Sequence, residues 1–196
     1  MKRVFDLVAS VSGLVVLSPF FLVIALLIKL DSVGPVFFRQ ERVGRHGLPF
    51  YIHKFRTMTM DAEKRGLQIT VSGDQRVTRV GAFLRRYKLD ELPQLIDVVE
   101  GKMSLVGPRP EVPKYVEVYP SEIRQLVLSV RPGITDNASI LYRSENDVLA
   151  QAEDPERAYL EQVLPEKLRL YVDYVRNRSF WGDVKIILMT LRVIGR

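Results

Sequence analysis

The chain has 196 residues, enough for one domain or for one domain with an appendage. Hydrophobic residues make up 47% of it and charged residues 27%, which supports a packed core and excludes wholesale disorder. The net charge of +6, from 29 Lys and Arg against 23 Asp and Glu, favours an anionic partner such as nucleic acid, acidic lipid headgroups or a phosphorylated substrate.

The residue types that are rare or missing narrow the chemistry further. There is no cysteine, which excludes disulfides, thiolate metal sites and a thiol nucleophile, and which is typical of a reducing compartment. His46 and His53 are the only histidines, so a multi-histidine zinc site is excluded. Carboxylates are therefore the main candidates for acid–base work.

An uncharged, mostly aliphatic stretch occupies residues 7–28. As one straight helix it would be about 33 Å long, close to the thickness of a bilayer core, so a single transmembrane helix is one interpretation. A cleaved signal peptide is disfavoured because the stretch is too long and no small-x-small site follows it. Ser18 and Pro19 stand near its middle. Pro19 cannot donate a hydrogen bond to the carbonyl of Val15, and the Ser18 hydroxyl is placed to help satisfy that carbonyl.

Positive charge flanks the apolar stretch on both sides, with Lys2 and Arg3 before it and Lys29, Arg39, Arg42 and Arg45 after it. Positive flanks mark the cytoplasmic side of a membrane. A helix-break-helix that enters the membrane and returns would place both flanks there. We therefore favour a re-entrant hairpin, broken at Ser18-Pro19, over a straight span.

Beyond residue 30 the pattern is that of a soluble-type domain. Residues 35–40 and 50–55 are predicted strands, with residues 44–47 as the turn of a hairpin. Residues 76–88 are a predicted helix, and a second begins at Asp90 and stops at Gly101, whereas residues 104–113 are too rich in proline for a helix. Further helical patterns cover residues 121–130, 155–164 and 166–176.

The last stretch, residues 180–196, is too short and too charged to span a membrane. It begins with Phe180 and Trp181 and mixes aliphatic residues with Lys185, Arg192 and Arg196. This pattern favours a helix that lies in the headgroup region. An ordinary C-terminal core helix is the alternative.

Residues 85–93 (RRYKLDELP) carry the most chemical information, because two adjacent carboxylates follow three cations within six residues. In the structural interpretation Asp90 caps a helix, Glu91 favours its dipole and Pro93 occupies its first turn. In the functional one the exposed N–H groups and the arginines bind phosphate. A carboxylate there could attack phosphorus to form a covalent intermediate, and its neighbour could ligate Mg²⁺.

More cations stand beside rigid turns. Pro108 and Pro110 fix the backbone on either side of Arg109, so that its guanidinium is presented at little entropic cost. Arg131 opens a second such turn with Pro132 and Gly133. Lys54 and Arg56, two apart on a predicted strand, would point to one face. Each cation alone is typical of a solvated surface, and their joint occurrence indicates phosphate binding.

Taken together these motifs resemble the bacterial sugar transferases, the monotopic phosphoglycosyl transferases. The resemblance covers essentially the whole chain: the Ser18-Pro19 hairpin, residues 54–58 (KFRTM), 89–95 (LDELPQL), 101–110 (GKMSLVGPRP) and 131–135 (RPGIT). Each piece is weak alone, but this order and spacing are specific. The resemblance implies transfer of a sugar-1-phosphate from a UDP-sugar to a polyprenol phosphate such as undecaprenyl phosphate, with release of UMP, as the first membrane step of glycan assembly.

The resemblance also implies roles for individual residues. Asp90 would be the nucleophile that carries the phosphosugar, and Glu91 would be the ligand of Mg²⁺, the implied cofactor. Arg85 and Arg109 would hold phosphates, with Pro108 and Pro110 placing that turn near the nucleotide. Weaker substrate-binding assignments follow for Lys54, Arg56 and Arg131.

The implied fold is α+β: a mostly helical, compact catalytic domain with a short β-hairpin, an N-terminal re-entrant membrane helix-break-helix and interfacial amphipathic helices. We expect the membrane hairpin over 1–34, the catalytic domain over 35–178 and an interfacial helix over 179–196. The expected location is monotopic, on the cytoplasmic face of the bacterial inner membrane, with membrane lipid as a partner. Homo-oligomerisation stays open.

Two departures from the family pattern concern the donor sugar. Many relatives carry Ser or Thr directly before the Leu-Asp-Glu unit, where this chain has Tyr87 and Lys88, and many continue differently after Thr135. The chain also lacks the extra membrane spans of larger relatives, so we expect the minimal catalytic form.

The competing hypothesis is a non-enzymatic, polybasic membrane module, and a nucleic-acid binder is disfavoured by the apolar N-terminus.

Overall fold

The computed structural model describes residues 1–60, 62, 73–143 and 145–194. Its fourteen named helices and strands follow one another along the chain as α1 (Lys2–Asp31), β1 (Phe37–Val43), β2 (Pro49–Phe55), α2 (Arg79–Arg86), α3 (Gln94–Val99), β3 (Ser104–Val106), α4 (Pro113–Glu117), α5 (Ser121–Val127), β4 (Gly133–Thr135), α6 (Asn137–Leu141), α7 (Glu145–Ala150), α8 (Pro155–Ala158), α9 (Leu164–Asn177) and α10 (Phe180–Ile194). The described part of the chain is thus the expected mixture of mostly helix with a short hairpin.

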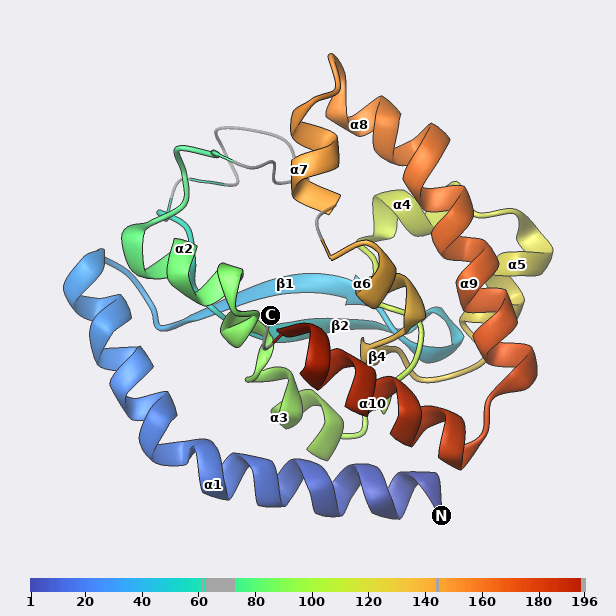
Figure 1. Cartoon of the computed structure of the whole chain (residues 1–196), viewed down its shortest axis with the longest axis horizontal. Coiled ribbons are helices and arrows are strands. Elements are labelled where there is room, and N and C mark those ends of the chain that lie inside the picture. Colours follow the sequence, from blue (N-terminus) through green and yellow to red (C-terminus); the bar gives the residue numbers. More distant parts are fainter. Residues whose placement is uncertain (61, 63–72, 144, 195–196) are drawn as a thin grey trace.

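Helix α1 is long and apolar enough to cross a membrane, and little of its apolar stretch is buried in the protein. Figure 1 shows it as a bent rod whose two arms follow two sides of the molecule. Pro19 lies inside the helix, and the Ser18 hydroxyl donates to the Val15 carbonyl at 2.8 Å. The predicted break therefore appears as a bend within one helix, since Pro19 withholds a backbone bond and Ser18 satisfies the oxygen.

Both ends of α1 are attached to the domain. Asp6, near its start, accepts a hydrogen bond from the Ser104 hydroxyl at 2.8 Å, and Lys2 donates to the Val106 carbonyl at 3.1 Å. At the other end Ile24 and Ile28 are buried in a cluster with Phe55 and Leu84. The residues between these attachments are largely exposed and apolar: Val11, Val15, Val16, Phe20, Leu22, Val23 and Leu26.

The two small sheets are built differently. Strands β1 and β2 form the predicted antiparallel hairpin, in register from Phe37 opposite Phe55 to Val43 opposite Pro49. The sequence did not predict β3 and β4, which pair in parallel although 26 residues separate Val106 from Gly133. Three-residue strands of this kind leave no alternating pattern long enough to detect.

The core lies between the hairpin and the C-terminal helices. Its largest cluster joins α4 and α5 to α9 through buried tyrosine, valine and leucine side chains. Helices α8 and α9 follow each other through a π-helical turn, Tyr159–Val163, instead of forming the two separate helices predicted over 155–164 and 166–176. Pro165, in the first turn of α9, has no N–H to give to the preceding turn, and the chain winds more widely there.

Helix α10 packs one side against the domain and exposes another, so its interfacial position stays a prediction. Ile186 is buried in a cluster with Tyr174 and Val175 of α9, as in a core helix. Trp181, Leu188 and Leu191 are exposed, as in a helix at a membrane surface. The predicted stretch also included residues 195 and 196, which lie outside the described residues.

Candidate active site

The acidic pair lies in a 3-10 turn, Leu89–Glu91, between α2 and α3. The prediction of a helix that begins at Asp90 is wrong, because α3 begins only at Gln94 and Asp90 does not cap it. Lys88 adopts a left-handed conformation with φ of 55°, which ends the preceding helix and redirects the chain. The turn places Asp90 and Glu91 at the junction of two helices.

The Asp90 carboxylate is buried, and its Oδ1 has no hydrogen-bond partner among the described residues. Burial raises the pKa of Asp90, and the charge of Glu91 raises it further, while Lys54 and Arg85 act in the opposite direction. A buried carboxylate oxygen without a donor is costly to maintain. Asp90 thus has one oxygen that nothing in the described part of the chain occupies.

Glu91 has the opposite environment. Its carboxylate accepts from both terminal nitrogens of Arg109, at 2.9 Å for the Nη1–Oε2 pair, and from Lys54 Nζ at 2.8 Å. Burial opposes ionisation, but the charges of Arg109 and Lys54 hold the pKa of Glu91 well below its usual range. Two adjacent carboxyl groups with pKa values driven apart are typical of a functional site.

Arg109 reaches Glu91 because two turn motifs lie against each other. Gly133 N–H donates to the Pro108 carbonyl at 2.9 Å, and Gly107 N–H to the Thr135 carbonyl at 3.1 Å. A Cβ on Gly133 would lie 2.1 Å from the Gly107 nitrogen, so the contact requires glycine. The predicted turns around Arg109 and before Gly133 are thus two sides of one contact, with Pro108 and Pro110 buried beside Arg109.

The structure gathers five of the predicted site residues and separates two. Lys54, Arg85, Asp90, Glu91 and Arg109 form one group, in which Arg85 acts on Asp90 through its charge. Arg56 follows the end of β2 and donates to the carbonyls of Ser32 and Val33 beyond α1, so it does not reach the acidic pair in this structure. Arg131 donates to the Gly101 carbonyl, beyond the other end of α3 from Asp90.

Two supporting contacts lay outside the sequence prediction. Arg42 donates to the Pro110 carbonyl at 3.0 Å and so holds the turn of Arg109 from the hairpin side. Asp97 of α3 accepts the backbone N–H of His53 and its ring Nδ1, both at 2.8 Å, which ties the strand of Lys54 to the helix after Glu91. The sequence shows Asp97 seven residues after Asp90, but it does not show that Asp97 binds His53, because that contact depends on tertiary packing.

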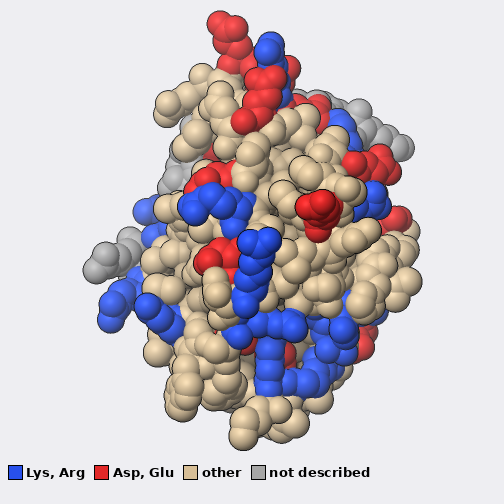
Figure 2. Space-filling view, turned by 90° about the vertical axis from the view of Figure 1, so that its right-hand side faces the viewer, with Lys and Arg blue, Asp and Glu red and all other residues tan. Residues whose placement is uncertain are grey.

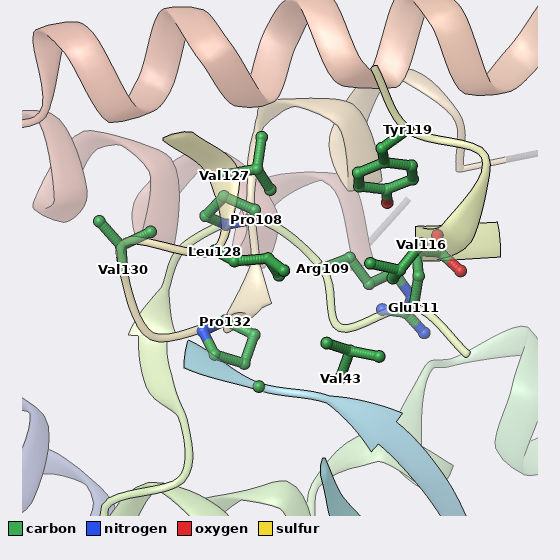
Figure 3. Close-up of a pocket in the computed structure, with 11 residues that line it drawn as sticks. Val43, Pro108, Arg109, Glu111, Val116, Tyr119, Val127, Leu128, Val130 and Pro132 are labelled. Carbon is green, nitrogen blue, oxygen red and sulfur yellow. The ribbon is translucent and has the colours of Figure 1, made fainter. Parts of the chain in front are cut away.

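A narrow, mostly apolar pocket adjoins Arg109 (Figure 3). Arg109 and Glu111 contribute its charged groups, and Tyr119 a hydroxyl-bearing ring. The aliphatic side chains around it are those of Val43, Val116, Val127, Leu128 and Val130. Arg109 therefore belongs to both places: its guanidinium donates to Glu91, and the residue also lines the apolar pocket.

Two places in the described part of the chain hold carboxylate groups that could bind a metal ion. His53, Asp97 and Glu100 have ligand atoms within 4.8 Å of one another, but Arg39 contacts His53 Nε2 and Lys102 pairs with Glu100, so these groups are already engaged. At the acidic pair Asp90 Oδ1 has no partner within the described residues, whereas Glu91 is engaged by Arg109 and Lys54, so a metal ion would have to replace these cations at Glu91. Oxygen donors of this kind fit Mg²⁺, which is usually bound by one or two carboxylates together with substrate phosphates.

The comparisons with known proteins identify the family of the chain. The model of the bacterial sugar transferase family matches residues 1–196, and the chain belongs to that family. A UDP-N-acetylgalactosamine-undecaprenyl-phosphate N-acetylgalactosaminephosphotransferase of Aeromonas hydrophila is 40% identical over 99% of this chain and 43% of its own length. The UDP-glucose:undecaprenyl-phosphate glucose-1-phosphate transferase of Escherichia coli is 40% identical over 97% of this chain and 39% of its own length.

The chain thus spans about two-fifths of the length of these two relatives. A shorter relative, the exopolysaccharide production protein PSS of Rhizobium leguminosarum, is 41% identical over 97% of this chain and 93% of its own length. The region shared with all three includes the acidic pair and the turns that hold Arg109, because the matches cover nearly the whole chain.

Proposed function

We propose that this chain transfers a sugar-1-phosphate from a UDP-sugar to undecaprenyl phosphate, with Asp90 as the covalent carrier. The names of the relatives support the donor and acceptor classes, and they name two different sugars, so the sugar is not carried over. The observation that carries the proposal is the contrast between the free, buried oxygen of Asp90 and the fully paired carboxylate of Glu91.

The reaction would proceed in two displacements at one phosphorus. Asp90 attacks the phosphorus next to the sugar, the bond to the bridging oxygen breaks, and UMP leaves with that oxygen. A phosphate oxygen of undecaprenyl phosphate then attacks the same phosphorus and breaks its bond to Asp90. The products are the lipid diphosphosugar and the restored carboxylate.

Cations of the chain would bind the donor during both steps. Lys54 and Arg109 both pair with Glu91, the chain neighbour of Asp90. Arg85, in the last turn of α2, acts on Asp90 through its charge. Arginine binds phosphate oxygens in pairs, so the Glu91 contacts of Arg109 can be exchanged for donor oxygens. Mg²⁺ would supply charge neutralisation on the diphosphate, and Glu91 would hold it once donor oxygens have taken over the Arg109 contacts.

The test is covalent capture from the donor alone. Wild type incubated with Mg²⁺ and a panel of UDP-sugars should release about one UMP per chain and gain the mass of one phosphosugar. Asp90→Asn should lose both signals, while Asp173→Asn, at an exposed site where the carboxylate accepts from Asn177, should keep them. Capture by Asp90→Asn would exclude it as the nucleophile, and no UMP release from any UDP-sugar would favour the polybasic membrane module.

We also propose that α1 is re-entrant and that the catalytic domain rests on the cytoplasmic face of the membrane. The attachment of Lys2, Asp6 and Ile28 to one domain supports this, because a straight span would carry one end of α1 across the bilayer. Since the chain has no cysteine, single cysteines report topology cleanly. Cysteines at exposed Val4 and Val118 should both be labelled by a membrane-impermeant maleimide from the cytoplasmic side only. Labelling of position 4 from the opposite side would establish a span.

A further inference from the structure

Two arginines from distant segments meet at the carboxyl end of α3. Arg3 donates to the carbonyls of Val98 and Val99, at 2.7 and 3.3 Å. Arg131 Nε donates to the Gly101 carbonyl at 2.8 Å. The two side chains are neighbours, because a Cβ on Gly101 would lie 3.4 Å from Arg3 Nη2. The exposed carbonyls at a helix end attract cations, which explains why both arginines reach this point.

A third arginine joins them from the tip of the hairpin. Arg45 Nε donates to the carbonyl of Ser129, two residues before Arg131, at 2.9 Å. Burial lowers the pKa of Arg131, and the charges of Arg3 and Arg45 lower it further, so both of these guanidinium groups lie near enough to act on Arg131. We call Arg3, Arg45 and Arg131 the arginine cluster.

Acids do not pair directly with the arginine cluster in the described part of the chain, although the charge of Asp6 acts on Arg131. Within the described residues none of the three arginines forms a salt bridge. Of the nearby carboxylates, Asp6 accepts from Ser104, and Glu100 pairs with Lys102. The terminal nitrogens of Arg45 and Arg131 have no protein partner in the described part of the chain and remain free to donate to an added ligand.

The cluster lies at the level where α1 begins. Arg3 stands four residues before the apolar stretch of residues 7–28, and the Phe5 and Phe180 rings pack edge to face at 5.4 Å, which places the start of α10 beside the start of α1. The next ring, Trp181, is 77% exposed. Exposed tryptophan with flanking basic residues is typical of headgroup depth. This placement depends on the membrane orientation proposed above.

Figure 2 shows the side of the molecule that carries the N-terminus, with Lys and Arg side chains gathered in its lower half and little acidic surface among them. Phosphate is the anion that suits this arrangement, because guanidinium forks donate paired hydrogen bonds to phosphate oxygens. At headgroup depth that phosphate is the phosphodiester of an anionic lipid.

We infer that the arginine cluster is a binding site for the phosphate of an anionic phospholipid, separate from the acidic pair. Helix α3, six residues or about 9 Å long, stands between Asp90 and the Gly101 carbonyl that holds Arg131. A lipid phosphate bound there would fix the first arm of α1 and the hairpin tip against the membrane surface. Arg131 therefore binds lipid and not the reacting donor.

The test measures lipid retention by the full chain in neutral detergent micelles. Phosphatidylglycerol and phosphatidylcholine with the same acyl chains are titrated in, and bound lipid is counted by native mass spectrometry. Wild type should retain phosphatidylglycerol in preference to phosphatidylcholine. Each basic residue near an anionic surface changes the binding constant about fivefold, so Arg45→Gln should weaken phosphatidylglycerol about fivefold and Arg45→Gln/Arg131→Gln about 25-fold.

The matched control is Arg157→Gln/Arg169→Gln, which removes the same charge from exposed salt bridges on α8 and α9. It should leave the lipid preference unchanged. Equal losses in both double variants would show diffuse attraction to net charge and overturn the site. If Arg131→Gln prevents folding, the lipid preference of Arg45→Gln alone tests the site. This variant should fold, since it removes only one side-chain hydrogen bond, from Arg45 to the Ser129 carbonyl.

A second arm separates a lipid phosphate from a free one. Inorganic phosphate is titrated without lipid, against chloride at equal ionic strength. We expect wild type to bind inorganic phosphate weakly and to lose this binding in Arg45→Gln/Arg131→Gln. Wild type should still prefer phosphatidylglycerol to phosphatidylcholine. Phosphate binding without any preference for phosphatidylglycerol would assign the cluster to a soluble anion and overturn the lipid. Covalent capture at Asp90 in the same micelles and cysteine labelling at Val4 report independently whether the proposed reaction and orientation hold.

Discussion

Asp6 and Ser104 stand 98 residues apart, yet the Ser104 hydroxyl donates to the Asp6 carboxylate at 2.8 Å in a buried contact between the start of α1 and strand β3. The backbone N–H of Leu105 adds a longer contact to the same carboxylate at 3.4 Å. Through β3 and its parallel partner β4, the first turns of the apolar helix are connected to the turn that carries Arg109.

This connection is testable by a double-mutant cycle. Asp6→Ala leaves buried donors without an acceptor, so it should lower the free energy of unfolding by about 1–3 kcal/mol. Ser104→Ala should cost less, and the double variant less than the sum, by about 0.5–3 kcal/mol of coupling. The measurement is thermal or denaturant unfolding in micelles. Additive effects would show that the two side chains do not interact.

The Arg109–Glu91 pair should not tolerate lysine. Arg109→Lys keeps the charge but loses the fork that binds both Glu91 oxygens, and with it one charge-assisted hydrogen bond of about 1.5–3 kcal/mol. We expect kcat/KM for UMP release to fall about 10- to 100-fold. Arg169→Lys, in an exposed pair with Glu166, is the matched control and should change it less than twofold.

The acid limb of the pH profile should report Asp90. Its carboxylate must be ionised to attack, and burial, followed by the charge of Glu91, raises its pKa above the usual value of an aspartate. Activity should therefore fall with decreasing pH at a pH above that value. Arg85 lowers the same pKa, so Arg85→Gln should shift the limb to still higher pH, whatever it does to the maximal rate. A shift to lower pH would contradict the assignment.

The same pKa shift predicts a stability effect. Because folding raises the pKa of Asp90, the ionised carboxylate opposes folding at pH values above its unfolded pKa, and this cost disappears as the pH falls. Asp90→Asn should thus be more stable than wild type at neutral pH, by about 1 kcal/mol, while inactive. The difference in melting temperature should shrink towards acidic pH. A variant less stable at neutral pH would show that the burial cost is repaid in the native state.

Gly133 tests the contact between the two turns. Gly133→Ala would place a Cβ 2.1 Å from the Gly107 nitrogen, and the backbones would have to separate. We expect a loss of about 1–3 kcal/mol, as for overpacked cores, together with reduced activity because Arg109 shifts. Gly13→Ala is the control for replacing a glycine without positive φ, since its Cβ would meet only the end of the Leu95 side chain, at 3.2 Å. Equal losses would mean that the close approach is unimportant.

Local chemistry in the sequence determined much of this protein. The absence of cysteine, the Asp90-Glu91 pair after a run of cations, the hairpin strands and the proline in the apolar stretch were all readable, because each acts over a few residues. The residues at which helices begin were harder to predict from the sequence. The 3-10 turn around Asp90 replaces a predicted helix start because Lys88 turns left-handed, which side-chain patterns do not indicate.

Only the tertiary structure decided which cations serve the acidic pair. Lys54 and Arg56 are two residues apart, but Lys54 reaches Glu91 while Arg56 binds the carbonyls that follow α1. Arg109 reaches the pair because Gly107 and Gly133 allow two distant backbones to touch. These contacts join segments far apart in the chain, and their geometry depends on packing between elements, which a linear pattern does not encode.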